Sequence, residues 1–597
     1  MKTINFLCLS IAAAMSAAVQ TASAAQPPDT VQSDGSGNTA SGTSALLALT
    51  TGYDNTAYGY RAMINATTGA ENTAFGEDAL ANTVTGSFNT AVGRWALANN
   101  TASNNSALGY FALSSNTSGT SNTAAGYDAL YYNTSGGNNT AAGANALLAN
   151  TQGSDNSAFG EEALTSNTEG SQNTAVGYQA LQFNTTGYDN TALGISSLNV
   201  NTSGSNNTAA GNSALQFNTI GNENSAFGDS SLYDNTTGAD NSALGYESLG
   251  SNTTGSLNTA VGVQSLTFNT TGSENTAVGD RALNDNTSGS NNTAVGVEAL
   301  NSNGSGNYTT AVGAYALASN TTGNYVTAVG ANALYSSTTG SYTTAVGANA
   351  LSSNTTGGYD TAFGADSLPD NTTGTGNTAF GYAALRSTTS GNNNIGFGYQ
   401  SLYLNSTGST NIAMGYQAGS KLVSGSNTIE IGNVGESSDN NVIRIGTEST
   451  QTAAYIAGIN GAQVTGAAVY VTSSGRLGVQ ASAERYKIAI AAMGANTDKL
   501  QELRPVTFHM KSDPDGVLQY GLIAEEVDRV YPELVIRDQS GKIQGVHYEE
   551  LAPMLLNEVQ RQQAAIAELR KQVAELSSLK KEVAALRIES RALVAKR

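Results

Sequence analysis

The chain has 597 residues, of which 67 are glycine and only 12% are charged, a composition that argues against a string of ordinary globular domains or a large conventional enzyme. With one cysteine, Cys8, and two histidines, His509 and His547, the sequence excludes a disulfide framework, a thiolate metal site and a multi-histidine metal centre. Of its charged residues, 8 of the 25 basic and 28 of the 45 acidic ones precede Ser482, so the net charge of -20 lies in that part and disfavours nucleic acid and anionic membranes as partners.

The N-terminus has the pattern of an export signal. An early lysine precedes an apolar run over residues 4–19, and the small residues 22–24 offer a cleavage site. We predict a signal peptide over residues 1–24 and a flexible leader over residues 25–51. The protein is therefore expected to be secreted or displayed at a bacterial cell surface, without stable membrane insertion.

A repeat of 17 residues occupies positions 52–446. Each unit has the order Asn-Thr-Ala-apolar-Gly, two variable residues, Ala-Leu and a polar loop. The anchoring glycines from Gly59 to Gly432 delimit 22 intervals, of which 21 are 17 residues long. One unit has too few apolar residues to fold alone, but stacked units bury a continuous stripe. The sequence predicts a mainly β protein built on a β-solenoid or β-roll fibre, roughly 110 Å long at ~4.8 Å per coil.

The small residues of the repeat suggest how chains associate. Alanine and glycine alternate around the apolar position, which predicts a flat face that three solenoids place toward a common axis. The Asn and Thr positions predict side-chain ladders along the fibre. The pattern resembles the head repeats of trimeric autotransporter adhesins, whose coils are shorter.

Aromatic residues often follow the anchoring glycine and form a stripe of constant phase. Packing between coils or subunits is the simpler interpretation, and a surface for a glycan or another host-surface ligand is the alternative. Acidic residues near the same turns lack the spacing of a calcium loop, and we predict no metal site and no cofactor. The stripe comprises Tyr60, Tyr110, Tyr127, Tyr178, Tyr246, Tyr382, Tyr399 and Tyr416, with Trp95 one position further from its glycine.

The composition changes after the repeats. Residues 447–481 are predicted to form connector strands, and residues 482–550 a small α/β domain with a much higher charge content. Within that domain we predict helices over residues 486–504 and 520–530, a strand over 506–510 and a hairpin over 535–548. The two histidines are expected to be surface or satisfied residues.

Several stretches of this domain resemble the peptidase S74 domain, the intramolecular chaperone of endosialidases and other trimeric tail-fibre proteins. The resemblance covers about 120 residues, and its motifs occur in the family's order. They are Leu477–Lys487, Leu503–Phe508, Tyr520–Val527, Tyr531–Leu534 and Val546–Tyr548 with Leu551.

The resemblance implies homotrimerisation and self-cleavage by a serine–lysine dyad. Ser482 matches the family serine, Lys487 the lysine and Arg485 a supporting arginine. Cleavage is expected between Ala481 and Ser482, with Lys487 as a base that must be neutral to act. The aspartate that often follows the serine is Ala483 here. The alternative is a helix-capping serine beside an exposed lysine.

Residues 551–597 are predicted to form a coiled-coil helix. Their apolar residues recur at heptad spacing with one three-residue phase shift, which favours a parallel coiled coil and leaves dimer and trimer open. A helix packed on its own domain is the alternative. The heptad residues are Val559, Ile566, Leu569, Val573, Leu576, Leu579, Val583, Leu586 and Leu593.

These elements together predict an exported, trimeric, adhesin-like fibre whose C-terminal chaperone sets the register of identical repeats and then cleaves itself. The alternatives are a phage-type tail fibre or receptor-binding protein with the same chaperone, and a trimerisation domain that is retained without cleavage. The export signal disfavours a phage protein. A glycan-cleaving enzyme is disfavoured because the repeats have no aperiodic insertion for paired carboxylates.

Overall fold

The computed structural model describes residues 32–448, 450–457, 468–472, 476–538 and 540–596. The predicted signal peptide lies outside these residues. The chain divides into two compact units, Met1–Ala454 and Tyr455–Arg597, which are treated separately below.

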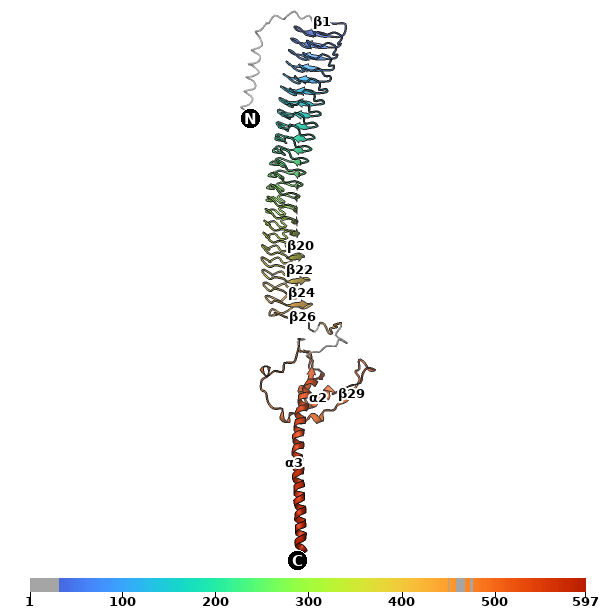
Figure 1. The fold of residues 1–597 in the computed structure, drawn as a ribbon, viewed down its shortest axis with the longest axis vertical. Coiled ribbons are helices and arrows are strands. Elements are labelled where there is room, and N and C mark those ends of the chain that lie inside the picture. The colour runs from blue at the N-terminus through green and yellow to red at the C-terminus, as the bar shows by residue number, and fades with distance from the viewer. Residues whose placement is uncertain (1–31, 449, 458–467, 473–475, 539, 597) are drawn as a thin grey trace. The chain divides into compact units, whose positions relative to one another are not determined.

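The first unit is a β-solenoid in which each coil contributes one short strand to a 26-stranded sheet (Figure 1). Strand β1 (Gln32–Ser33) pairs antiparallel with β2 (Thr39–Ser41), and every later pair is parallel and in register, threonine on threonine and alanine on alanine in most coils. The later strands are β3 (Thr56–Tyr58), β4 (Thr73–Phe75), β5 (Thr90–Val92), β6 (Ser106–Leu108), β7 (Thr123–Ala125), β8 (Thr140–Ala142), β9 (Ser157–Phe159), β10 (Thr174–Val176), β11 (Thr191–Leu193), β12 (Thr208–Ala210), β13 (Ser225–Phe227), β14 (Ser242–Leu244), β15 (Thr259–Val261), β16 (Thr276–Val278), β17 (Thr293–Val295), β18 (Thr310–Val312), β19 (Thr327–Val329), β20 (Thr344–Val346), β21 (Thr361–Phe363), β22 (Thr378–Phe380), β23 (Ile395–Phe397), β24 (Ile412–Met414), β25 (Ile429–Ile431) and β26 (Ile443–Ile445).

The solenoid begins earlier than the sequence pattern predicted. Strand β2 lies inside the segment 25–51 that was predicted to be a flexible leader, and it pairs with β3 in the register of the later coils. The reason is visible in the sequence, since Asn38-Thr39-Ala40-Ser41-Gly42 already has the order of the repeat with serine at its apolar position.

The core of each coil consists of the middle alanine of the strand and the leucine four residues after the anchoring glycine. From Leu80 to Leu402 these leucines are fully buried, and each adopts a left-handed backbone with φ between 50° and 55°. That conformation costs a non-glycine residue roughly 1 kcal/mol, whereas burial of a leucine side chain contributes about 2 kcal/mol. The burial of the leucine therefore offsets the strain of the turn that places it in the core.

Asparagine ladders line the interior of the solenoid. The Asn258 side chain donates to Asn241 Oδ1 at 3.1 Å, and its own Oδ1 accepts the backbone N–H of Asn275 at 3.0 Å. A second ladder connects Asn252 Nδ2 to Asn235 Oδ1 at 2.8 Å. These amides satisfy the polar groups that the tight turns would otherwise bury unpaired. The structure thus contains the ladders that the repeat pattern predicted and places them inside.

The alanine and glycine positions differ from the prediction that they form a flat outer face. The alanines point into the solenoid's own core, and the anchoring glycines stack on one another between coils. The outward positions of β2–β26 are the first residue of each strand, which is Thr or Ser as far as β22 and Ile from β23, and the third residue, which is Tyr58 in β3 and apolar in the later strands. Because side chains alternate along a strand, these two columns form what we call the outer sheet face.

The second unit combines short strands and 3-10 helices with one long helix. Residues 486–504 do not form the predicted α-helix, because Ala489 and Gly494 take left-handed backbone conformations with φ of 54° and 55°. The elements are β27 (Tyr470–Val471), β28 (Leu477–Gly478), η1 (Glu484–Tyr486), η2 (Gly494–Thr497), η3 (Leu500–Glu502), β29 (Val506–Phe508), β30 (Gln519–Gly521), α2 (Ala524–Val530), η4 (Pro532–Leu534), β31 (Val535–Arg537), β32 (Ile543–Val546) and α3 (Tyr548–Val594).

The core of the second unit is small. Its fully or nearly buried apolar residues come from α2, η4, the hairpin β31–β32 and the start of α3, whereas Ile488 and Val517 are more than four-fifths exposed. A unit with so few buried side chains has little hydrophobic stabilisation of its own. The buried residues are Val527, Tyr531, Leu534, Val535, Val546 and Met554.

Candidate active site

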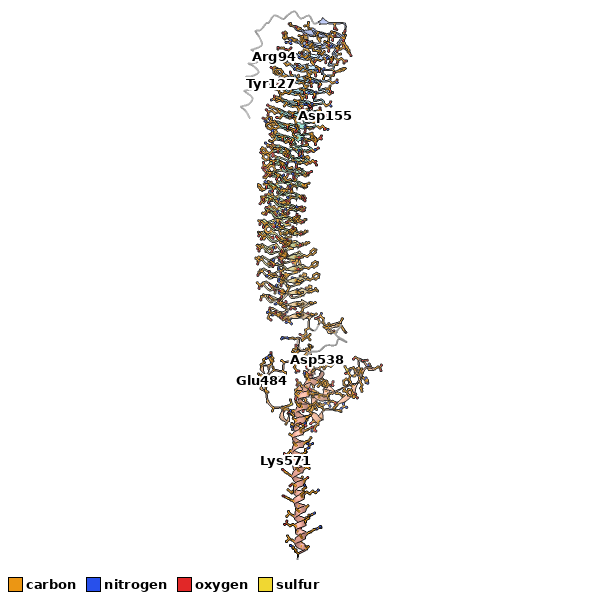
Figure 2. All side chains as sticks on the ribbon, viewed as in Figure 1. Arg94, Tyr127, Asp155, Glu484, Asp538 and Lys571 are labelled. Carbon is orange, nitrogen blue, oxygen red and sulfur yellow. The ribbon has the colours of Figure 1, made fainter. Side chains whose placement is uncertain are left out.

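The two residues predicted to form a catalytic dyad lie within hydrogen-bond distance. Lys487 Nζ donates to Ser482 Oγ at 3.3 Å. The 3-10 helix η1 turns the chain between them, with the backbone N–H of Tyr486 bonded to Ala483 O and that of Lys487 to Glu484 O. Lys487 therefore follows a single short turn rather than standing on the longer helix that the sequence predicted. Glu484, which lies in that turn, is labelled in Figure 2.

The arginine of the predicted motif has a different contact. The Arg485 guanidinium lies over the ring of Tyr486, 4.7 Å from its centroid. A cation over an aromatic face is a favourable electrostatic contact, and here it holds the Arg485 side chain against the next residue of η1. Because Arg485 precedes Lys487 by only two residues, its positive charge belongs to the same short turn.

The dyad is exposed to solvent in the single chain. Ala481, Ser482 and Lys487 are all exposed, and so are the residues between them. A serine hydroxyl becomes a nucleophile when a neighbouring base removes its proton, and a lysine is such a base only as a neutral amine. Burial and nearby positive charge both favour the neutral amine. Ser482 and Lys487 thus have the geometry for proton transfer. The burial that favours a neutral lysine would have to come from other copies of the chain.

Three contacts outside the dyad connect separate segments of the second unit. Arg504 pairs with Glu526 at 2.6 Å, and this guanidinium lowers the pKa of the Glu526 carboxyl. The Tyr531 hydroxyl accepts the backbone N–H of Lys499 at 3.1 Å, and the Tyr548 hydroxyl accepts that of Leu522 at 2.7 Å. The sequence motifs included Arg504, Tyr531 and Tyr548 without assigning them these roles.

The long helix α3 presents its heptad residues to solvent. Arg561 on α3 contacts Asp498, and Asn557 donates to Thr497 Oγ1 at 2.7 Å, so the first turns are fastened to the segment around η2. Beyond them, the apolar residues of the predicted coiled coil are 47–68% exposed. Lys571, labelled in Figure 2, lies in this exposed part. A row of exposed leucines and valines along a single helix is typical of a coiled-coil strand without its partners.

The tyrosine stripe of the solenoid is partly stacked. Tyr382, Tyr399 and Tyr416 stack with centroids 5.6 and 5.3 Å apart, and Tyr110 stacks on Tyr127 at 5.6 Å. In such a stack the ring faces cover one another, and mainly ring edges and hydroxyls remain exposed. Sugar rings pack against open aromatic faces, so the unstacked members of the stripe are the better candidates for a glycan contact.

Among the described residues, the structure brings together no cluster of three or more His, Cys, Asp or Glu side chains that would hold a metal ion. His509 Nδ1 lies 3.0 Å from Gly516 O, and His547 Nδ1 lies 2.8 Å from Glu549 Oε1. The described part of the chain also contains no helix that is both long and apolar enough to span a membrane.

A family comparison supports the predicted resemblance. Residues 482–536 match the family model of Peptidase S74, described as chaperone of endosialidase. The match starts at Ser482 and follows a solenoid of about 24 turns. A comparison with curated proteins found no match. The chaperone domain and the solenoid fibre together support a tail-fibre-like trimerisation protein.

Proposed function

We propose that this protein is an exported, trimeric, adhesin-like fibre whose C-terminal region is an intramolecular chaperone that cleaves itself at Ser482. The observation that carries the proposal is the pairing of Ser482 with Lys487 at 3.3 Å, at the first residue of the matched chaperone domain. The small core of the second unit and the exposed heptads of α3 support assembly with further copies of the chain.

The cleavage step uses residues of this chain alone. Lys487 takes the proton of the Ser482 hydroxyl, and Oγ bonds to the carbonyl carbon of Ala481. The bond between that carbon and the Ser482 nitrogen then breaks, and the nitrogen leaves as an amine that receives the proton. Water hydrolyses the resulting ester, which frees residues 482–597 from the fibre.

A repeat fibre needs such a device because its register is ambiguous. Most coils pair in parallel with the same offset of 17 residues, so a slip by one coil between chains loses only the contacts of one coil. A C-terminal domain that trimerises first aligns the chains and raises their local concentration. Once that domain is cut away, unfolded chains no longer realign, and the stability of the fibre becomes kinetic.

The test of self-cleavage is the intact mass of the purified chain with and without Ser482→Ala. We expect the unsubstituted chain to yield two fragments that meet at Ala481–Ser482, and Ser482→Ala to remain in one piece. Lys487→Gln should also remain uncut, whereas Lys499→Gln, in the same domain, should be cut normally. Cleavage of the Ser482→Ala chain at the same bond would disprove the nucleophile assignment.

The test of trimerisation is the molar mass of the uncut Ser482→Ala chain by light scattering. We expect three copies, and we expect Leu576→Asp with Val583→Asp to reduce the mass toward one copy because buried charges disrupt a coiled-coil core. The matched control is Lys571→Asp with Lys581→Asp, which changes the net charge by more and leaves the heptad positions intact. A monomeric Ser482→Ala chain would contradict the proposal.

Two other outcomes correspond to the alternatives. A trimer that is never cut would identify a retained trimerisation cap. Fibre assembly without export, measured by fractionating cells that express the full chain, would favour a phage-type tail fibre or receptor-binding protein. In both cases the solenoid remains the fibre and the second unit its assembly domain.

A glycan or other host-surface ligand for the fibre remains part of the proposal and is tested by binding to the Ser482→Ala trimer.

A further inference from the structure

The outer sheet face of the solenoid carries no Asp, Glu, Lys, Arg or His side chain along strands β2–β26. From β2 to β26 the first residue of each strand is Thr, Ser or Ile, and from β3 to β26 the third residue is Tyr58 or an apolar residue. Many of these third residues are about half exposed, including Leu108, Leu244, Phe397 and Met414. A chain with a net charge of -20 thus leaves one uninterrupted apolar column on its surface.

The residues that border this face include acidic ones in the coils up to β16 and none over β18–β24. Five residues before the anchoring glycine, seven of the coils up to β16 carry Asp or Glu, whereas four successive later coils carry tyrosine. The residue just after the glycine is alanine or tyrosine in the coils of β18–β24. The acidic residues are Asp54, Glu71, Asp155, Asp189, Glu223, Asp240 and Glu274, and the tyrosines are Tyr308, Tyr325, Tyr342 and Tyr359.

The four tyrosines form a rigid border to this face. Tyr308, Tyr325, Tyr342 and Tyr359 stack with centroids 5.1, 5.1 and 5.2 Å apart, and each ring is at least half exposed. Stacked rings lose little conformational entropy when a partner covers them, because their neighbours already restrict them.

The dimensions of the outer sheet face suit a specific protein interface. A column about 110 Å long and ~10 Å wide has roughly 1,100 Å² of surface, from the spacing of strands and residues. A standard interface buries about 800 Å² on each partner. A partner that covers this face must itself be long, straight and apolar, with features repeating at the strand spacing. A second copy of the same solenoid meets all of these requirements.

We propose that the outer sheet face is the surface through which three solenoids pack, parallel and in register, around a common axis. Cyclic symmetry brings the same columns of each copy together, so neutral columns meet without repulsion. The uncharged part over β18–β24 lies closest to the axis, and the acidic border of the coils up to β16 lies farther out. The inference rests on the proposed trimer and adds to it the face that closes the fibre.

Engineered cysteines test this arrangement, because the only natural cysteine is Cys8. The test uses the full chain with Cys8→Ser and Ser482→Ala, in which Val346→Cys marks the outer sheet face and Thr339→Cys marks an exposed turn of the same coil. With a short bis-maleimide reagent we expect at least tenfold more covalent dimer from Val346→Cys than from Thr339→Cys.

The outcomes separate the two proposals. A chain that is trimeric by light scattering but links equally at both positions, or only at Thr339→Cys, would overturn the assigned face and leave the trimer intact. A monomeric chain would overturn both. As a second measurement, Val346→Asp should lower the melting temperature of the trimeric solenoid more than Thr339→Asp, and equal effects would contradict the assignment.

Discussion

Replacing Gly347 with alanine is expected to disrupt the solenoid locally and to cost about 2–6 kcal/mol. The backbone at Gly347 has φ of 136°, and an added Cβ would lie 2.5 Å from the carbonyl carbon and oxygen of Gly364 in the next coil. A non-glycine residue in such a conformation costs roughly 1–3 kcal/mol, and forced overpacking costs a similar amount. Both atoms belong to the backbone, so no side chain can move aside.

Gly304→Ala is the matched control. Gly304 lies at the position where neighbouring coils carry Thr287 and Thr321, and an added Cβ there meets one carbonyl oxygen at 3.3 Å. We expect Gly304→Ala to melt like the unsubstituted chain. Gly347→Ala should expose the amides of β20 and β21 to hydrogen exchange while distant coils stay protected, since repeat proteins open in local units. Equal protection in the two variants would contradict the stacking argument.

The sequence predicted the period, the β-solenoid class and the fibre from its repeats because indels are almost absent and the period is itself structural. It did not predict that the leucine of each coil is left-handed, since that conformation is stabilised by burial between coils. It also placed alanine and glycine on an outer flat face. The order of small and apolar residues does not say whether the alanine column or the apolar column of the strand points inward. The buried asparagine ladders fix the inward direction, because they place the alanines in the core.

The candidate site was predictable as a pair of residues and not as a geometry. The spacing of Ser482 and Lys487 and the neighbouring motifs identified the pair, and the short turn η1 brings the side chains together. The predicted long helix is absent from residues 486–504 because Ala489 and Gly494 reverse the backbone. Apolar periodicity alone does not reveal such reversals when alanine is frequent.

A buried carboxyl in the asparagine ladder is expected to make the solenoid less stable as the pH rises. Asp360 occupies a ladder position, is fully buried, and accepts the backbone N–H of Asn377 at 2.7 Å and Asn371 Nδ2 at 3.2 Å. Burial raises the pKa of Asp360 from 3.8 to about 7. The folded chain therefore holds this proton more tightly than the unfolded chain, and the stabilisation present below pH 4 is lost as the pH rises through about 7.

Asp360→Asn should remove this dependence and restore the ladder. The amide oxygen keeps the acceptor for Asn377, and the amide nitrogen supplies the kind of donor that the next ladder residue, Asn377, directs to the carbonyl of Gly391 at 2.9 Å. A shift of about three pKa units corresponds to roughly 4 kcal/mol, so at pH 8 the variant should be more stable by as much as that. At pH 4 the two chains should melt within a few degrees of each other. The matched control is Asp366→Asn, which makes the same substitution at a half-buried position six residues further along the chain. Burial also raises the pKa of Glu430, near the C-terminal end of the solenoid, to about 7. The unsubstituted chain and Asp360→Asn both retain Glu430, so the difference in stability between them reports on Asp360 alone. An equal gain at pH 4 and pH 8 would show that the variant acts by packing and not by removing a buried charge.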